Sequence, residues 1–224
     1  MSPQRFQRAR KPEEKAVRRQ ALLKAAKRLV TTMGPVDLTL TALAKRSGIS
    51  KPNIYRYFKS REEVLCQLWI GEVGSLVEDL PATLRGVPIG NIDATAKALA
   101  FAFSSQPQLC ELTSIMATVI EPQLTFDVVL DMKRLLGDLI MRTAQALHAQ
   151  LPSISLADCA WAAAAIAAHL PGTWPAAHPG PVTASVLARP EFAAMKPDFE
   201  REFARFLRVL FSGLVSRDSE TTRK

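Results

Sequence analysis

Histidine and cysteine are scarce in this sequence, which contains only three of each among its 224 residues. Cys66, Cys110 and Cys159 are too far apart for a zinc motif, and their odd number does not suit a disulfide framework. No two histidines share a helix face around a carboxylate, as a zinc protease requires. A glycine-rich phosphate loop and a Gly-x-Ser-x-Gly turn are also missing. The sequence therefore predicts no enzyme, no metal and no cofactor, with buried reduced thiols as the default and a redox sensor as an alternative.

Long apolar runs and strand-like alternation are lacking as well. The longest apolar stretch, around residues 159–170, is rich in alanine and too short to cross a bilayer. Met1 is followed by a charged polar segment rather than by the apolar core of a signal peptide. Without any alternating pattern, the predicted fold class is all-α. We expect a soluble, cytoplasmic chain with no membrane partner.

Positive charge is concentrated at one end of the chain. Residues 1–61 contain 16 Lys or Arg and three acidic residues, a net charge of +13. The remaining residues contain 13 basic and 18 acidic side chains, a net charge of −5. A cationic block of this kind is the electrostatic footprint of a polyanion binder.

Within this block, residues 39–63 (TLTALAKRSGISKPNIYRYFKSREE) predict two short helices around a turn. Thr39 can cap the first helix, because its hydroxyl accepts from backbone N–H groups two or three residues further on. Leu40 and Leu43 recur on one helix face and are expected to be buried. Gly48 stands where a residue with positive φ ends a helix at little cost.

The second helix is expected to begin at about Lys51, with Ser50 as its cap. Pro52 falls in the first turn, where its missing N–H has no partner to lose. Ile54 and Phe58, four residues apart, face inward. The solvent face then carries the amide, phenol and cationic groups that bind base edges and phosphates: Lys51, Asn53, Tyr55, Arg56, Tyr57 and Lys59.

Two further helices are expected to flank the pair. Ser60 and Glu63 form a capping box for a helix that starts at Arg61. Upstream, a helix of about five turns is predicted from its apolar spacing: Val17, Ala21, Leu22, Ala25, Leu29 and Val30. Plain packing of two helices is the alternative interpretation of the central pair. The coincidence of this helix pair with the cationic block favours a helix-turn-helix that binds DNA.

The segment from residue 13 to residue 69 resembles the N-terminal domain of the tetracycline-repressor family of bacterial transcription regulators. The resemblance lies in TLTALAKRSGIS, then KPNIYRYF with SREEVL after it. It implies that Thr39, Tyr55, Tyr57 and Arg61 hold phosphates, while Thr41, Lys51, Pro52 and Asn53 approach bases. Pro52 and Tyr57 depart from the family, which often has a small residue and a histidine there. The complete predicted DNA-binding set is Thr39, Thr41, Ser50, Lys51, Pro52, Asn53, Tyr55, Arg56, Tyr57, Lys59 and Arg61.

The rest of the chain is long enough to form its own core. Proline and glycine mark a break at residues 80–91 and a connection at 171–190. Helical patterns occupy residues 92–105, 108–120, 122–150, 155–170 and 197–216. The predicted organisation is a disordered basic arm (1–12), a helix-turn-helix domain (13–60), a connecting helix (61–79), an effector-binding and dimerisation domain (80–216) and a disordered tail (217–224). The arm either contacts DNA or is simply a frayed terminus.

The last two helices carry surfaces suited to dimerisation. One has a run of small residues beside a tryptophan, and the other a wide apolar stripe. Each helix could equally be buried within its own domain, but together they resemble the helices that form a four-helix dimer interface in the family. The predicted interface is Trp161, Ala164, Ala168, Phe203, Phe206, Leu207, Leu210 and Phe211. One short reading helix covers few base pairs, so we expect a homodimer on a near-palindromic site.

The middle helices are expected to hold a small-molecule effector. Such sites are mostly apolar, with a few polar groups that orient the ligand. The candidate lining residues are Phe101, Phe103, Leu112, Met116, Ile120, Phe126, Leu130 and Trp161, and ordinary core packing is the alternative for each of them. In the family, a ligand in such a pocket shifts the protein away from its DNA-binding conformation.

The predicted function is a sequence-specific, homodimeric repressor that is released from its DNA operator by an unidentified small apolar effector. A nonspecific or architectural DNA-binding protein would explain the basic arm but not the large helical remainder. A helical enzyme with a basic surface would need a cluster of titratable groups. Activation instead of repression remains open.

Overall fold

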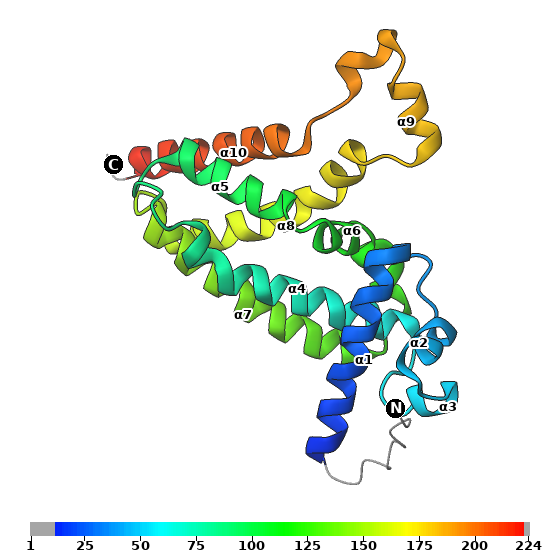
Figure 1. The fold of residues 1–224 in the computed structure, drawn as a ribbon. Coiled ribbons are helices and arrows are strands. Elements are labelled where there is room, and N and C mark those ends of the chain that lie inside the picture. Colours follow the sequence, from blue (N-terminus) through cyan, green and yellow to red (C-terminus); the bar gives the residue numbers. More distant parts are fainter. Residues whose placement is uncertain (1–11, 222–224) are drawn as a thin grey trace. The chain divides into compact units, whose positions relative to one another are not determined.

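The computed structural model describes residues 12–221, and over this range it contains helices and turns but no strand, which confirms the all-α class (Figure 1). The chain forms two compact units, Met1–Leu68 and Trp69–Lys224. The helices in chain order are α1 (Pro12–Met33), α2 (Leu40–Ser47), α3 (Lys51–Ile54), α4 (Arg61–Thr83), α5 (Ile92–Ser104), α6 (Pro107–Ile115), the π-helix η1 (Met116–Ile120), the 3-10 helix η2 (Glu121–Gln123), α7 (Phe126–Gln150), α8 (Leu156–Ala177), α9 (Pro181–Leu187), the 3-10 helix η3 (Pro190–Met195) and α10 (Phe199–Thr221).

The first unit consists of α1, α2, α3 and the first residues of α4. Helix α1 packs against α2, and α2 packs against α3. Leu43, Ile54 and Phe58 are completely buried, as their spacing predicts. The apolar face of α1 differs from the predicted stripe, because Leu22, Ala26 and Val30 are buried whereas Val17 is exposed.

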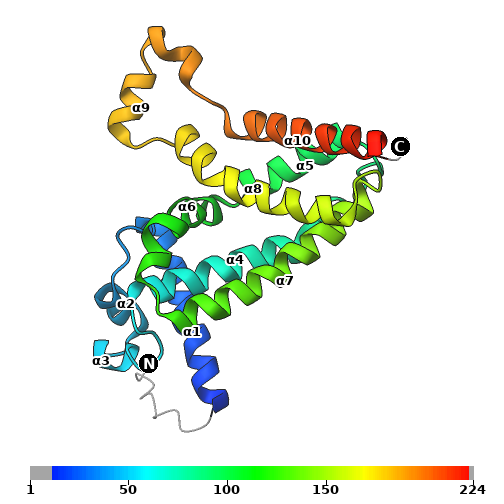
Figure 2. The ribbon, with the colours of Figure 1, turned by 180° about the vertical axis from the view of Figure 1, so that it is seen from behind.

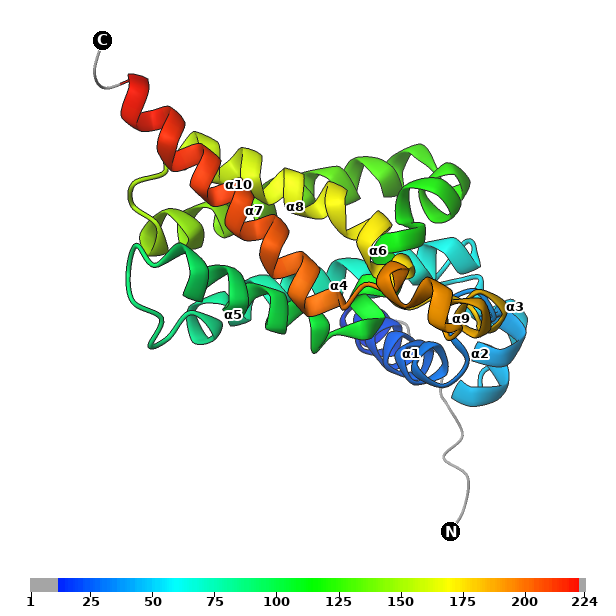
Figure 3. The same ribbon diagram turned by 90° about the horizontal axis from the view of Figure 1, so that it is seen from above.

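The second unit is a bundle around one apolar core. Helix α10 packs against α5 and α8, while α6 and α7 also pack against α8 (Figures 1 and 3). An aromatic cluster lies at the centre of the α5–α8–α10 contact. The centre of the Phe203 ring is 5.1 Å from that of Phe199 and 5.2 Å from that of Phe103. The His169 ring stacks on the Phe206 ring, with 3.7 Å between their centres. This core fixes the positions of helices that surround the apolar cavity described below.

Prolines end fewer helices than the sequence predicts. Helix α8 continues through Pro171 and Pro175 to Ala177, and α4 passes Pro81 to end at Thr83. A proline inside a helix costs about 3 kcal/mol, so other contacts must offset it. In α8 the burial of Leu170 and Trp174 does so, and Trp174 packs edge-on against Phe199 at 4.8 Å.

The chain between α8 and α10 is also more regular than predicted. It contains α9 and η3, which extend away from α8 and α10 in Figures 1 and 2. Helix α10 runs to Thr221, so residues 217–221 are helical instead of forming a disordered tail. Arg217 forms an ion pair with Asp158 of α8 near that end. The predicted arm up to residue 11 and residues 222–224 lie outside the described residues.

None of the helices between residues 12 and 221 is both long and apolar enough to cross a membrane.

Candidate DNA-binding site and ligand cavity

The first helix of the predicted DNA reader begins and ends through local chemistry. Thr39 lies in extended conformation before α2, and its Oγ1 accepts a hydrogen bond from the Ala42 N–H at 3.0 Å. At the other end Gly48 adopts φ +68°, and its N–H donates to the Ala44 carbonyl. A residue with a side chain is strained at this φ, so glycine allows the sharp turn into α3.

Helix α3 is short and presents polar side chains. It spans a single turn, Lys51–Ile54, and further turns follow it up to Tyr57. Ser50 precedes α3, but it caps through its carbonyl oxygen, which accepts from the Asn53 N–H at 2.9 Å. Its hydroxyl makes no capping bond, contrary to the prediction. Nine members of the predicted DNA-binding set are exposed, namely Thr39, Thr41, Ser50, Lys51, Pro52, Asn53, Tyr55, Arg56 and Lys59, and Tyr57 and Arg61 are half-buried.

Arg61 is held by the protein itself. Its Nη1 donates to the Val36 carbonyl at 2.8 Å, and its Nε donates to the Glu62 carboxylate at 2.9 Å. A guanidinium has five N–H donors, so donors remain for a phosphate beside these two bonds. The contact with Val36 fixes where the guanidinium lies.

A buried carboxylate joins α1 and α4 to the segment between α3 and α4. Glu63 Oε2 accepts from the Lys59 N–H at 2.7 Å, and Oε1 pairs with Arg19 Nη2 at 3.0 Å. The Glu63 N–H donates to Ser60 Oγ, so half of the predicted capping box is present while the carboxylate bonds one residue earlier. The Arg19 guanidinium also lies 4.8 Å from the centre of the Phe58 ring. The sequence prediction missed Arg19, although its spacing from Leu22 and Ala26 places it on the buried face of α1.

Replacing Glu63 by glutamine is expected to destabilise the first unit by about 1–2 kcal/mol. The amide keeps the shape of the side chain but loses the charge and one of the two acceptor oxygens that bind Lys59 and Arg19. Urea unfolding measures the change. Glu62→Gln is the matched control, because it affects only the half-exposed pair with Arg61. Equal losses for both variants would show that the Glu63 network does not stabilise the unit.

The second unit contains an apolar cavity of about 190 Å³ that is open on one side, where the lining residue Ala167 is exposed. Five helices contribute to its wall, and their lining residues are Trp69, Val73, Leu76, Val77 and Leu80 of α4, Leu99 and Phe103 of α5, Leu109 and Thr113 of α6, Leu136, Leu139, Ile140, Thr143 and Leu147 of α7, and Ala163, Ile166, Ala167 and Leu170 of α8. Such an apolar hollow between helices of a bundle is a typical site for a small molecule.

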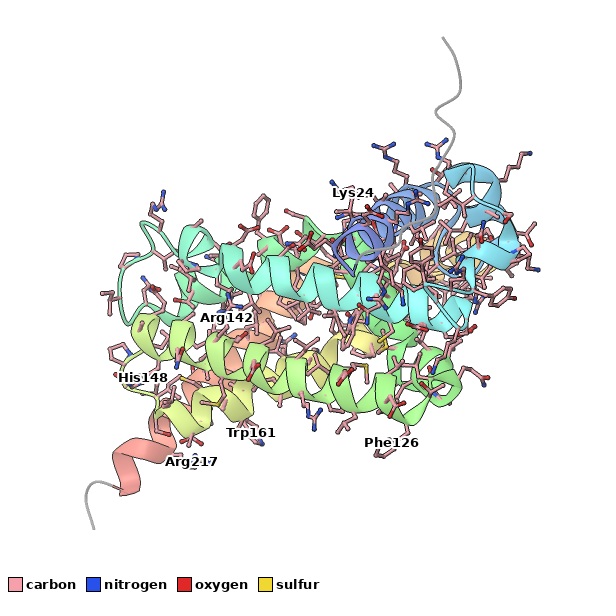
Figure 4. All side chains as sticks on the ribbon, turned by 90° about the horizontal axis from the view of Figure 1, so that it is seen from below. Lys24, Phe126, Arg142, His148, Trp161 and Arg217 are labelled. Atoms are coloured by element: carbon pink, nitrogen blue, oxygen red, sulfur yellow. The ribbon has the colours of Figure 1, made fainter. Side chains whose placement is uncertain are left out.

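Most of the predicted effector residues lie elsewhere. Phe103 lines the cavity. Phe101 is 62% exposed, because two residues along a helix turn the side chain to the opposite side. Phe126 and Trp161 are 79% and 57% exposed and point away from the bundle in Figure 4, and Leu130 is also exposed. Leu112, Met116 and Ile120 are buried but do not belong to the cavity wall.

The predicted dimer residues fall into two groups. Phe203, Leu207 and Phe211 are buried in the core of their own unit, so that part of the predicted interface is wrong. Their stripe on α10 faces α5 and α8 within one chain. Surface positions comprise the exposed Trp161, Ala164 and Ala168 and the half-buried Phe206 and Leu210.

The thiols are buried, and Cys110 is the best defined. Its Sγ donates to the Phe103 carbonyl, and burial raises the pKa of Cys110 to about 12, with a smaller contribution from the nearby Glu111. A thiol with such a pKa is not a reactive thiolate at neutral pH, which counts against a redox sensor at this position. Among residues 12–221 no group of three or more His, Cys, Asp or Glu side chains could hold a metal ion.

Family models match both units of the chain. The model described as bacterial regulatory proteins of the tetR family matches residues 22–68, which contain α2 and α3. The model described as a tetracyclin repressor-like C-terminal domain matches residues 71–218. The chain belongs to the tetracycline-repressor (TetR) family. This family consists of regulatory proteins, in agreement with the prediction that the chain is not an enzyme.

Individual TetR-family relatives give the same assignment over parts of the chain. The HTH-type transcriptional regulator EthR of Mycolicibacterium smegmatis is 36% identical over 114 residues, which are 43% of this chain and 52% of EthR. The regulator BetI of Rhizobium meliloti is 32% identical over 69 residues, 31% of this chain and 34% of BetI. The chain thus spans about half of the first relative and a third of the second.

A solved structure shows the same fold. FadR from Bacillus subtilis, crystallised in complex with stearoyl-CoA, superposes with a TM-score of 0.54 at 17% identity. The superposition covers 87% of this chain and 98% of FadR.

Proposed function

We propose that this TetR-family protein is a homodimeric repressor that binds a near-palindromic DNA operator and leaves it when a small apolar effector occupies the cavity. The observation that carries the proposal is the combination of a cationic helix-turn-helix in the first unit with a partly open apolar cavity in the second. EthR and BetI are named as transcriptional regulators, and FadR binds an acyl-CoA, which supports both halves of the proposal.

The DNA contact follows from the exposed groups of residues 39–61. The Asn53 amide and the Lys51 ammonium have the donors that read base edges in the major groove. Thr39, Tyr55, Tyr57 and Arg61 would hold phosphates, which fixes the register of the protein on the duplex. Because these contacts come from one short helix and its surroundings, a single copy would cover only a few base pairs.

A second copy would double the contact. Two-fold related readers need half-sites about one helical turn apart, 34 to 36 Å, which is why we propose a near-palindromic operator. The surface of α8 and α10 is the proposed interface, made of Trp161, Ala164, Ala168, Phe206 and Leu210. Small side chains on α8 allow close approach of a partner helix, and Trp161 adds a large exposed apolar area.

Replacing Ala168 by glutamate is expected to weaken this dimer by at least about tenfold, because the interface would bury a carboxylate without a partner in each copy. Analytical ultracentrifugation measures the dissociation constant. Ala149→Glu is the matched control, since Ala149 is exposed on α7 outside the proposed interface. A dimer that tolerates Ala168→Glu as well as Ala149→Glu would place the interface elsewhere.

Release by an effector is proposed as a shift of population. A ligand that binds one conformation more tightly shifts the equilibrium towards that conformation. The shift is at most the difference between its binding free energies for the two conformations. Helix α4 is the proposed connection, because its first residues belong to the helix-turn-helix unit while Trp69, Val73 and Leu80 line the cavity.

The test of the proposed function is a footprint on the DNA that flanks the protein's own gene, with excess nonspecific DNA as competitor. We expect protection of two half-sites related by a two-fold axis. Protection without a preferred site would favour the second candidate, a nonspecific or architectural DNA-binding protein. The +13 charge of residues 1–61 is the observation behind that candidate.

A further inference from the structure

The cavity wall in the second unit contains no charged side chain among its lining residues, all of which belong to the described part of the chain. Three lining residues have a polar side-chain atom, namely Trp69, Thr113 and Thr143. The chemistry that the cavity offers to a ligand therefore depends on whether these three atoms are available.

The donors of these three groups are already used within the protein. The Trp69 Nε1–H donates to Thr113 Oγ1 at 2.9 Å. The Thr113 hydroxyl donates to the Leu109 carbonyl at 2.7 Å, and the Thr143 hydroxyl donates to the Leu139 carbonyl at 2.8 Å. Consequently no lining side chain in this described region has an N–H or O–H left for a ligand. A carboxylate or carbonyl that entered would lose its hydrogen bonds to water without replacement.

The volume limits the size of the ligand. An apolar cavity of about 150 Å³ lined by Leu, Ile and Phe stays dry and binds benzene in another protein. At about 190 Å³, the cavity of this chain has room for one ring with a short substituent. A long acyl chain would extend beyond this volume through the open side, and its charged head would find no cation among the lining residues.

We propose that the cavity selects neutral, hydrocarbon-rich molecules of about the size of a substituted benzene ring and rejects their carboxylate analogues. The selection arises from the missing donors and missing charges, since burying an anion without a partner is far more costly than burying a hydrocarbon. This proposal concerns the same cavity as the proposed function. Only the step from ligand binding to release from DNA rests on that function.

Three probes of nearly equal shape test the selection on the full-length protein. Isopropylbenzene, benzamide and benzoate have the same number of non-hydrogen atoms and differ in polarity and charge. At about 100 times its Kd, isopropylbenzene is expected to raise the Tm by about 5–10 °C. Benzamide should bind more weakly, because its carbonyl finds no donor, and benzoate should cause no shift.

Filling the cavity provides the site control. In Ala163→Leu the larger side chain enters the cavity from a buried position, and Ala167→Leu narrows its open side, because Ala167 lines the cavity but is exposed. Both are expected to abolish the shift caused by isopropylbenzene. Ala149→Leu adds the same atoms at an exposed position of α7 and should leave the shift unchanged.

The outcomes separate the ligand class from the proposed function. If isopropylbenzene causes no shift, or benzoate causes an equal one, the proposed ligand class is wrong. A shift that persists in both filled variants also overturns it, because the probe would then bind elsewhere. If isopropylbenzene binds as expected but leaves DNA affinity unchanged, the ligand class stands and release by an effector fails.

Discussion

Replacing Phe203 by alanine is expected to destabilise the second unit by about 3–5 kcal/mol, the usual cost of removing a fully buried phenyl ring. The side chain is completely buried and its ring contacts Phe103 and Phe199. Truncation would remove these contacts and leave a void, since neighbouring helices relax only partly around such a change. Thermal unfolding measures the loss.

The same variant separates a core residue from an interface residue. We expect Phe203→Ala to lower the Tm at every protein concentration while leaving the dissociation constant of the dimer nearly unchanged. Val209→Ala on the same helix is the control, because Val209 is 67% exposed and its truncation should hardly alter the stability. If Phe203→Ala weakened the dimer but left the Tm unchanged, Phe203 would be an interface residue and not a core residue.

Replacing Asn53 by alanine is expected to lower the affinity for the operator by about 1–3 kcal/mol per half-site, and to do so twice in a symmetric dimer. The side chain is exposed in the first turn after Ser50, where an amide can form a bidentate contact with a base. Affinity for other sequences should change little, so base preference at that position is relaxed. Titration against operator and scrambled DNA at one salt concentration measures the difference.

Tyr57→Phe is the better control for this experiment. It removes a proposed phosphate contact and should weaken binding to all sequences alike. Thr39→Ala would seem equivalent, but Thr39 Oγ1 also caps α2 through the Ala42 N–H. That substitution therefore costs about 1 kcal/mol of helix stability as well, and mixes a folding effect with a binding effect. A loss confined to the operator in Tyr57→Phe would contradict the division into base and phosphate contacts.

The DNA-reading unit was predictable because its signals are local. Capping by Thr39, the left-handed Gly48 and the inward pair of Ile54 and Phe58 involve residues at most four positions apart. The contact of Arg19 with Glu63 joins residues far apart in the sequence. A periodic pattern shows that a residue lies on the buried face, but it does not show which partner stands opposite.

The cavity and the ends of α8 were less predictable for the same reason. Phe101 and Phe103 are equally apolar, and only the packing of α5 decides which one faces the cavity. Pro171 predicts the end of a helix, but the burial of Trp174 about one turn later stabilises the continuation of α8. Tertiary contacts thus overrode a local signal in α8, while in α2 local and tertiary preferences agreed.

The buried thiol of Cys110 offers a measure of how often the second unit opens. With a pKa of about 12 it is almost entirely protonated at neutral pH, and alkylating reagents attack only the thiolate. Once the surrounding helices separate, the pKa returns to about 8.5 and the thiol becomes reactive. When reclosing is faster than alkylation, the rate of Cys110 alkylation in the native protein therefore follows the fraction of molecules that are open. A ligand that fills the cavity, which the preceding residue Leu109 lines, should slow that rate.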